Sequence, residues 1–87
     1  MEAVAIRLPV GERWTYLCGQ VDAKKSGEVV VRAFDAPALC AVGEAERGPD
    51  AEPVLVPSGE GRRLVGQHFF ARSADPARAC LLTYRGL

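Results

Sequence analysis

Turn-forming residues interrupt this sequence at short, fairly even intervals, and this spacing limits what the chain can fold into. The stretches between the turns are too short for ordinary helices, but they have the length of strands of about 4–8 residues. The turn signals are Pro9, Gly11, Ser26-Gly27, Pro37, Gly43, Gly48-Pro49, Pro53, Pro57-Ser58-Gly59, Gly61, Gly66 and Asp75-Pro76. The spacing therefore predicts a chain built from strands.

Apolar residues alternate with other residues in three segments, 3–8, 13–20 and 79–85. A period of two is typical of a strand with one face on a core. The residues that share a face are Val4, Ile6 and Leu8, then Trp14, Tyr16 and Cys18, and then Cys80, Leu82 and Tyr84. Segment 28–34 differs because Val29, Val30 and Val31 are consecutive, which favours a strand covered on both faces.

Two connections decide the rest of the strand assignment. Asp75-Pro76 is expected to form a hairpin turn between strands at Phe69–Ser73 and Arg78–Arg85, because proline fixes φ and aspartate bonds the backbone beyond it. Segment Ala38–Arg47 has two interpretations. Asp35 and Pro37 could begin a helix there, but Gly43 and a weak apolar stripe favour a strand at Ala38–Val42 followed by a loop.

We therefore expect an all-β protein, a small antiparallel β-sandwich or jelly-roll-like barrel of about seven or eight short strands. The 87 residues form one domain, residues 1–87, and 48% hydrophobic against 25% charged residues is a globular composition. The loop Gly43–Pro53 is expected to be the most variable in position.

Residues for catalysis are few. His68 is the only histidine, and a nucleophilic pair with Cys80 is conceivable if their strands are adjacent. The alternative is a histidine at a sheet edge with Cys18, Cys40 and Cys80 acting as small buried hydrophobes in a reducing compartment. The cysteine spacings match neither a zinc knuckle nor a redox motif. We expect no metal and no cofactor.

The remaining polar motifs also have simple structural explanations. Ser58-Gly59-Glu60-Gly61 looks like a phosphate loop but lacks the downstream lysine and a following helix. The acidic residues gather in one predicted loop as a solvated charge run; they are Glu44, Glu46, Asp50 and Glu52. We therefore expect a protein that is not an enzyme and has no catalytic residues.

Overall charge argues against two classes of partner. Eleven basic side chains balance eleven acidic ones, so no net field attracts nucleic acid or an anionic membrane. The basic doublets Lys24-Lys25 and Arg62-Arg63 have acidic neighbours. No apolar run approaches the roughly 18 residues of a spanning helix, and the first residues do not have the composition of a secretory signal. We expect neither nucleic-acid nor membrane binding.

The region from Val29 nearly to the end resembles small β-sandwich proteins encoded among the structural genes of tailed bacteriophages. The shared pattern is a strand ending in apolar-Gly at Ala41-Val42-Gly43, a strand ending in Leu-x-Pro-x-Gly at Leu55–Gly59, and a last strand at Leu82–Arg85. Such a resemblance implies a virion component, a capsid decoration protein or a minor head, neck or tail protein. It also implies a product that is made in the host cytoplasm, assembles as a homo-oligomer and binds other virion proteins.

The apolar residues of several strands exceed what a core this small readily hides, so the surplus is expected at interfaces. The candidate interface residues are Trp14, Tyr16, Val30, Phe34 and Leu81.

Two other functions remain open. Trp14 and Tyr16 could form a stacking platform for sugars, which would make the protein a free-standing carbohydrate-binding module. A small regulator that pairs an edge strand with a host or rival protein is a further alternative.

Overall fold

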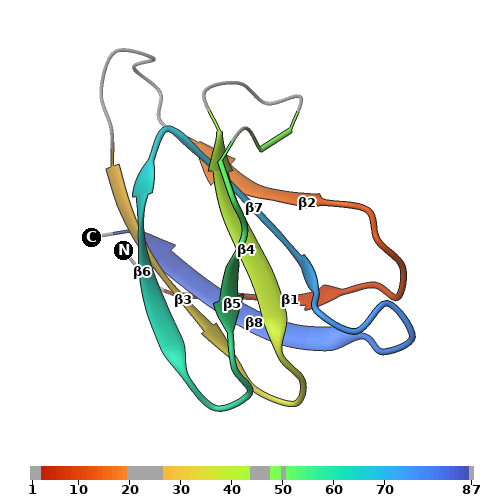
Figure 1. Ribbon diagram of the computed structural model, residues 1–87. Coiled ribbons are helices and arrows are strands. Elements are labelled where there is room, and N and C mark those ends of the chain that lie inside the picture. The colour runs from red at the N-terminus through yellow and green to blue at the C-terminus, as the bar shows by residue number, and fades with distance from the viewer. Residues whose placement is uncertain (1–2, 20–26, 44–47, 50, 87) are drawn as a thin grey trace.

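The computed structural model describes residues 3–19, 27–43, 48–49 and 51–86, and within them the chain forms eight strands and no helix (Figure 1). The strands are β1 (Val4–Leu8), β2 (Thr15–Gly19), β3 (Gly27–Ala33), β4 (Ala38–Gly43), β5 (Val54–Val56), β6 (Gly61–Gly66), β7 (His68–Ser73) and β8 (Cys80–Gly86). The predicted all-β fold is confirmed, and so is the strand, rather than a helix, at the start of segment 38–47. Residues 44–47 lie outside the described residues.

The strands form two four-stranded antiparallel sheets, which we call sheet A (β1-β8-β3-β6) and sheet B (β2-β7-β4-β5). Each strand in the first half of the chain pairs with its counterpart counted from the other end: β1 with β8, β2 with β7, β3 with β6 and β4 with β5. The chain is therefore one long hairpin that is rolled up so that alternate pairs fall in opposite sheets. This nested arrangement is the jelly roll.

Alternation along the strands builds the core between the two sheets. In β3, Val29, Val31 and Ala33 are at most 2% exposed and point inward. Their partners from β8 and β1 include Leu82 and Leu8, both fully buried. Sheet B contributes, among others, Phe69, Cys40, Ala71 and Val56 to the same cluster. The period-two pattern thus places one face of each sheet in the core, as expected.

The predicted cover on both faces of β3 is wrong for the described chain. Val30 points to the outer face of sheet A and is only half-buried, where it borders a hollow in the surface. Consecutive valines arise here because β3 is a central strand between β8 and β6. Its β-branched residues suit a sheet on either face.

The predicted hairpin at Asp75-Pro76 is also wrong. β7 belongs to sheet B and β8 to sheet A, so the connection crosses between the sheets. The local turn chemistry was nevertheless correct, because the Asp75 carboxylate accepts a hydrogen bond from the Ala77 amide at 3.0 Å. A turn signal fixes the change of chain direction but not the sheet in which the next strand lies.

A bulge breaks the predicted alternation in β2. The pairing with β7 shifts register between Tyr16 and Cys18. Tyr16 is 41% exposed and Leu17 is buried, as alternation requires, but beyond the shift Cys18 also packs against the core. The three residues Trp14, Tyr16 and Cys18 therefore do not share one face, because an extra residue in a bulge reverses the alternation beyond it.

Candidate functional site

The five candidate interface residues divide between opposite sides of the molecule. Val30, Phe34 and Leu81 lie on the outer side of sheet A, and Trp14 and Tyr16 lie on the outer side of sheet B. A two-sheet sandwich has its core between these sides, so the two groups cannot form a single site. The structure therefore offers two separate candidate binding faces.

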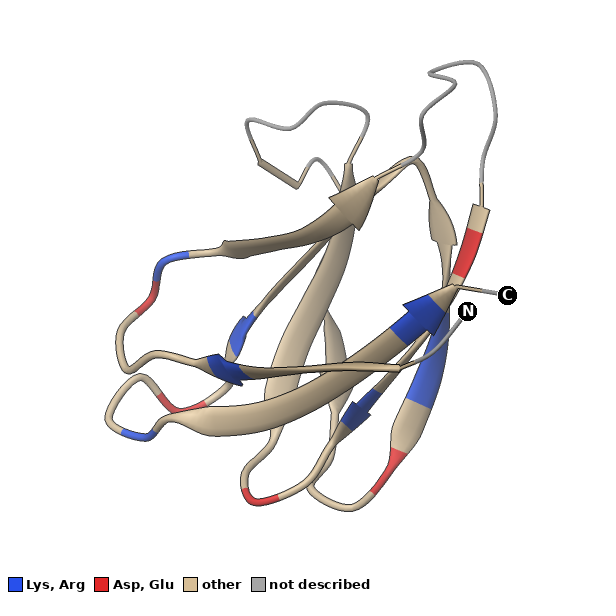
Figure 2. Cartoon of the chain, turned by 180° about the vertical axis from the view of Figure 1, so that it is seen from behind, with Lys and Arg blue, Asp and Glu red and all other residues tan. Residues whose placement is uncertain are grey.

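The outer face of sheet A, which we call the basic face, carries an arginine on every strand. Figure 2 shows these positions as blue segments on all four strands of the sheet. Its arginines are Arg7 on β1, Arg85 on β8, Arg32 on β3 and Arg63 on β6. The same face carries exposed apolar side chains, of which Phe34 is 44% and Val65 is 56% exposed.

The arginines of the basic face differ in their partners. Arg7 binds Asp35 at 3.1 Å, and Arg63 lies 3.7 Å from Glu28. Within the described chain, Arg32 and Arg85 form no ion pair with a carboxylate. The Arg32 guanidinium instead lies 5.7 Å from the centre of the Phe34 ring, a cation–π contact that helps to orient it.

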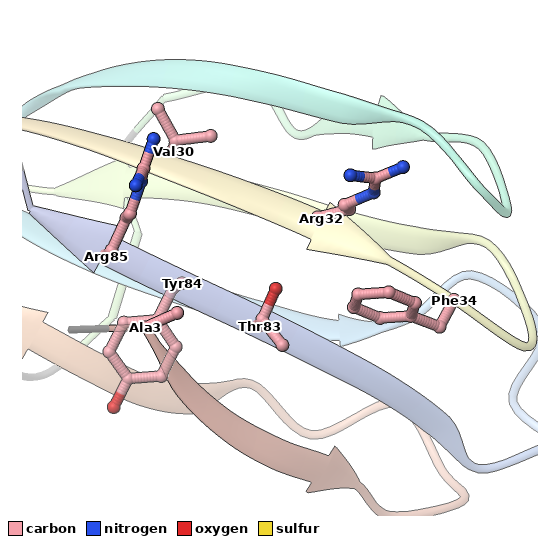
Figure 3. A pocket seen from close by; sticks show the side chains of 7 residues that line it. All are labelled: Ala3, Val30, Arg32, Phe34, Thr83, Tyr84 and Arg85. Carbon is pink, nitrogen blue, oxygen red and sulfur yellow. The ribbon is translucent and has the colours of Figure 1, made fainter.

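A hollow of about 450 Å³ lies beside these two arginines (Figure 3). It is lined by Ala3, Val30, Arg32, Phe34, Thr83, Tyr84 and Arg85. The close-up shows the Arg32, Arg85 and Val30 side chains and the Thr83 hydroxyl rising from the same side of the sheet. The hollow combines an apolar floor with two cations, and its volume lies in the range of binding pockets for small groups.

Asp35 fixes the corner of the basic face next to Phe34. Its carboxylate accepts a hydrogen bond from the Leu81 amide at 2.7 Å and another from the Arg7 guanidinium at 3.1 Å. The Leu81 bond first, and the Arg7 contact second, lower the pKa of the Asp35 carboxyl below its ordinary value. One side chain thereby ties the β3–β4 connection to β8 and β1.

Backbone contacts hold Phe34 itself. Its amide donates to the Leu81 carbonyl at 3.0 Å, and its carbonyl accepts from the Ser58 hydroxyl at 2.7 Å. Ser58 belongs to the segment Ser58-Gly59-Glu60-Gly61, which looks like a phosphate loop in the sequence. In the structure this segment is the turn between β5 and β6. Gly59 adopts a φ of 84° there, which favours glycine.

The outer face of sheet B, which we call the aromatic face, is built around a different set of contacts. The Tyr16 hydroxyl and Nδ1 of His68 are 3.0 Å apart, and the Tyr16 ring packs edge-on against Phe70 with centroids 5.5 Å apart. Phe70 is only 2% exposed although it lies outside the main core. The Arg72 guanidinium lies 5.2 Å from the centre of the Trp14 ring.

Apolar residues of β4 and β5 continue the aromatic face. Leu55 is 51% exposed and pairs across the strands with Leu39, which in turn pairs with Arg72. Gly19 leaves space for the tyrosine–histidine pair, because a Cβ at this position would overlap the Tyr16 hydroxyl and the His68 ring. Arg72 is the only charged residue among the strand residues named on this face.

The groups considered for catalysis are not assembled. His68 lies on the outer side of sheet B, whereas Cys80 is fully buried in sheet A and its thiol donates to the Ala36 carbonyl at 3.1 Å. Their strands are not adjacent, contrary to the premise of the suggested pair. Burial, reinforced by the nearby Cys80, raises the pKa of the Cys40 thiol to about 12, so Cys40 is unsuited to act as a thiolate.

Cys18 is half-buried, Cys40 and Cys80 are buried, and all three are free thiols. The described part of the chain brings together no group of three histidine, cysteine or acidic side chains that could hold a metal ion. Of the predicted acidic run, Glu52 is exposed, and Glu44, Glu46 and Asp50 lie outside the described residues, as do Lys24 and Lys25.

Sequence reasoning missed the polar half of the basic face. Arg32 is two residues from both Val30 and Phe34, and Arg85 follows Leu81 and Thr83 at the same spacing. Residues two apart share a face of a strand, so the sequence already placed each arginine on the same face as an interface candidate. The sequence pattern does not show that β3 pairs with β8, and this pairing brings the residues of the two strands together. Asp35 was considered only as a helix cap, and its long-range contacts carry no local signal.

The chain was compared with models of protein families, with curated proteins and with solved structures, and none matched. Among the described residues, no helix has the length and apolar character needed to cross a membrane.

We predict that Asp35→Asn lowers the melting temperature at neutral pH and weakens its dependence on acid. A lowered carboxyl pKa in the folded state means that Asp35 stabilises the fold fully above its ordinary value near 3.8 and progressively less as the pH falls below that value. Thermal unfolding between neutral pH and about pH 3 measures this. Glu12→Gln, which removes another exposed carboxylate, is the control. Identical acid profiles for wild type and Asp35→Asn would contradict the assignment.

Proposed function

We propose that this protein is a non-enzymatic structural component of a tailed-bacteriophage virion, a capsid decoration protein or a minor head, neck or tail protein. It forms homo-oligomers and binds other virion proteins. The observation that carries the proposal is the presence of large, exposed apolar side chains on the outer faces of both sheets. Tyr16, Leu55, Phe34 and Val65 are each more than 40% exposed. Large apolar side chains exposed on both outer faces are available for contacts with other proteins.

The charges on the two faces indicate which kind of partner each face binds. Among the described strand residues named on the aromatic face, Arg72 is the only charged one, so a second copy can approach this face with little like-charge repulsion. A self-complementary contact is the usual form of a dimer interface. On the basic face, Arg32 and Arg85 form no ion pair with a described carboxylate, so two copies placed face to face there would bring these like charges together. The aromatic face is therefore the contact between identical subunits, and the basic face is the contact with a different virion protein.

The architecture is compatible with this role. Jelly rolls recur in viral capsid proteins and also in lectins. One fold serves many functions, however, so the exposed faces and not the fold carry the argument. Oligomerisation also compensates for the small core of an 87-residue domain, because each buried apolar area contributes about 25 cal/mol per Å².

We predict that the purified protein is an oligomer and that Leu55→Glu converts it to a monomer. The new carboxylate would have to lose its water in the subunit contact, which is unfavourable for an unpaired charge. Val65→Glu on the basic face is a matched control, because Val65 is similarly exposed, at 56% against 51% for Leu55. Native mass spectrometry gives the subunit number. A monomeric wild type, or equal dissociation by both variants, would contradict the assignment of the aromatic face.

Carbohydrate binding is a second candidate, and one observation favours it. Trp14 lies on the outer side of sheet B near Tyr16 and is only half-buried, rather than enclosed in the core. Exposed aromatic rings can stack against the apolar face of a sugar. In this alternative, the aromatic face binds a glycan and the protein is a free-standing binding module.

A glycan array separates the two candidates. If the aromatic face binds sugars, the wild type gives a signal that Trp14→Ala abolishes and Val65→Ala retains, while circular dichroism shows that both variants are folded. The structural role predicts no glycan signal from the oligomer. A reproducible signal that depends on Trp14 would overturn the assignment of this face to subunit contact.

A further inference from the structure

Arg32 and Arg85 occupy diagonal corners of a four-residue block on the basic face. Arg32 lies directly opposite Thr83 across the β3–β8 ladder, and Val30 lies opposite Arg85. Diagonal positions on one face of an antiparallel pair are about 7–8 Å apart, a distance that long side chains span. Both guanidinium groups can therefore converge on one negatively charged group placed above the block, and Thr83 adds a hydroxyl beside it.

The surroundings of the block favour a compact ligand with an apolar part. Val30 and Ala3 line the hollow with aliphatic surface, and the Phe34 ring closes one end while it orients Arg32. Guanidinium groups match the planar, two-oxygen geometry of a carboxylate particularly well. An acidic side chain can pair with the arginines of the hollow, while a neighbouring apolar side chain packs on its apolar lining.

Acidic residues at the two ends of β3 argue against a long polyanion. Glu28 lies at the beginning of the strand, and Asp35 lies just after its end. Among the described residues, their ion pairs with Arg63 and Arg7 leave Arg32 and Arg85 as the arginines of this face that are available for a ligand. A nucleic acid needs a continuous series of phosphate contacts, and its backbone would meet a carboxylate on either side.

We infer that the hollow on the basic face binds an acidic segment of a partner protein, in which an aspartate or glutamate stands beside an apolar residue. The carboxylate is held between Arg32 and Arg85, and the apolar side chain packs on Val30 and Phe34. This inference specifies the partner chemistry for the binding role proposed above, and it rests on that role. It gives the basic face a function different from the subunit contact of the aromatic face.

Nuclear magnetic resonance with two blocked peptides tests the inference. The probes are acetyl-Gly-Leu-Asp-Leu-Gly-amide and its counterpart with Asn in place of Asp, each titrated into the isotopically labelled, full-length protein. We expect saturable shifts from the Asp peptide at the amides of Val30, Arg32, Thr83 and Arg85, and much smaller ones from the Asn peptide. Arg32→Gln and Arg85→Gln should each weaken binding by roughly fivefold.

Arg13→Gln is the matched control, because it removes the same charge from an exposed position on the β1–β2 connection. It should leave the affinity unchanged. Equal shifts from both peptides, no saturable shift at the hollow, or equal losses in all three variants would overturn the inference. Inorganic phosphate and a short oligothymidylate are titrated in parallel, and tighter binding of either one at the same amides would also overturn it.

The outcome is separable from the test of the proposed function. Subunit number depends on the aromatic face, whereas the peptide shifts report on the basic face. An oligomer that enters virions but gives no peptide shifts at the hollow would refute the partner chemistry alone. A monomer absent from virions would refute the structural role, even if the acidic peptide binds.

Discussion

Pairing between mirror positions of the two chain halves is the constraint on which the rest of the structure depends. Because β1 pairs with β8, β2 with β7, β3 with β6 and β4 with β5, every ladder joins residues from both halves. The β3–β8 and β4–β7 ladders then complete the two sheets. The inner face of each four-stranded sheet packs in the shared core. The outer faces receive no further layer from the described chain, and their side chains remain available.

The basic face shows how this topology positions side chains that are distant in sequence. The β3–β8 ladder places Arg32 beside Thr83 and Val30 beside Arg85. Asp35 then locks the end of the ladder by accepting from the Leu81 amide and from Arg7. The hollow therefore sits on the most central pair of strands in sheet A, where the backbone is held on both sides. Side chains on such rigid elements are better preorganised for binding than side chains on loops.

The sequence was sufficient for the fold class because turn residues and period-two alternation are local signals. They predicted about seven or eight strands, and the described residues form eight; they also predicted a strand at Ala38–Val42, which the structure has at Ala38–Gly43, and the turn at Asp75. They failed where pairing between distant strands decides the outcome. The segment after Asp75 crosses to the other sheet, and the bulge in β2 turns Cys18 toward the core on the same side as Leu17. The candidate interface residues were split between two faces for the same reason, since no local pattern tells which sheet a strand joins.

The described chain presents two outer faces, an aromatic surface on sheet B and an arginine-lined hollow on sheet A, and both support the proposed binding role. The most direct test of the proposed virion role is quantitative mass spectrometry of virus particles purified from cells that express this chain. The account predicts that the protein copurifies with intact particles at a constant ratio to the major capsid protein. Its absence from purified particles, when the infected or induced lysate contains it, would contradict the account.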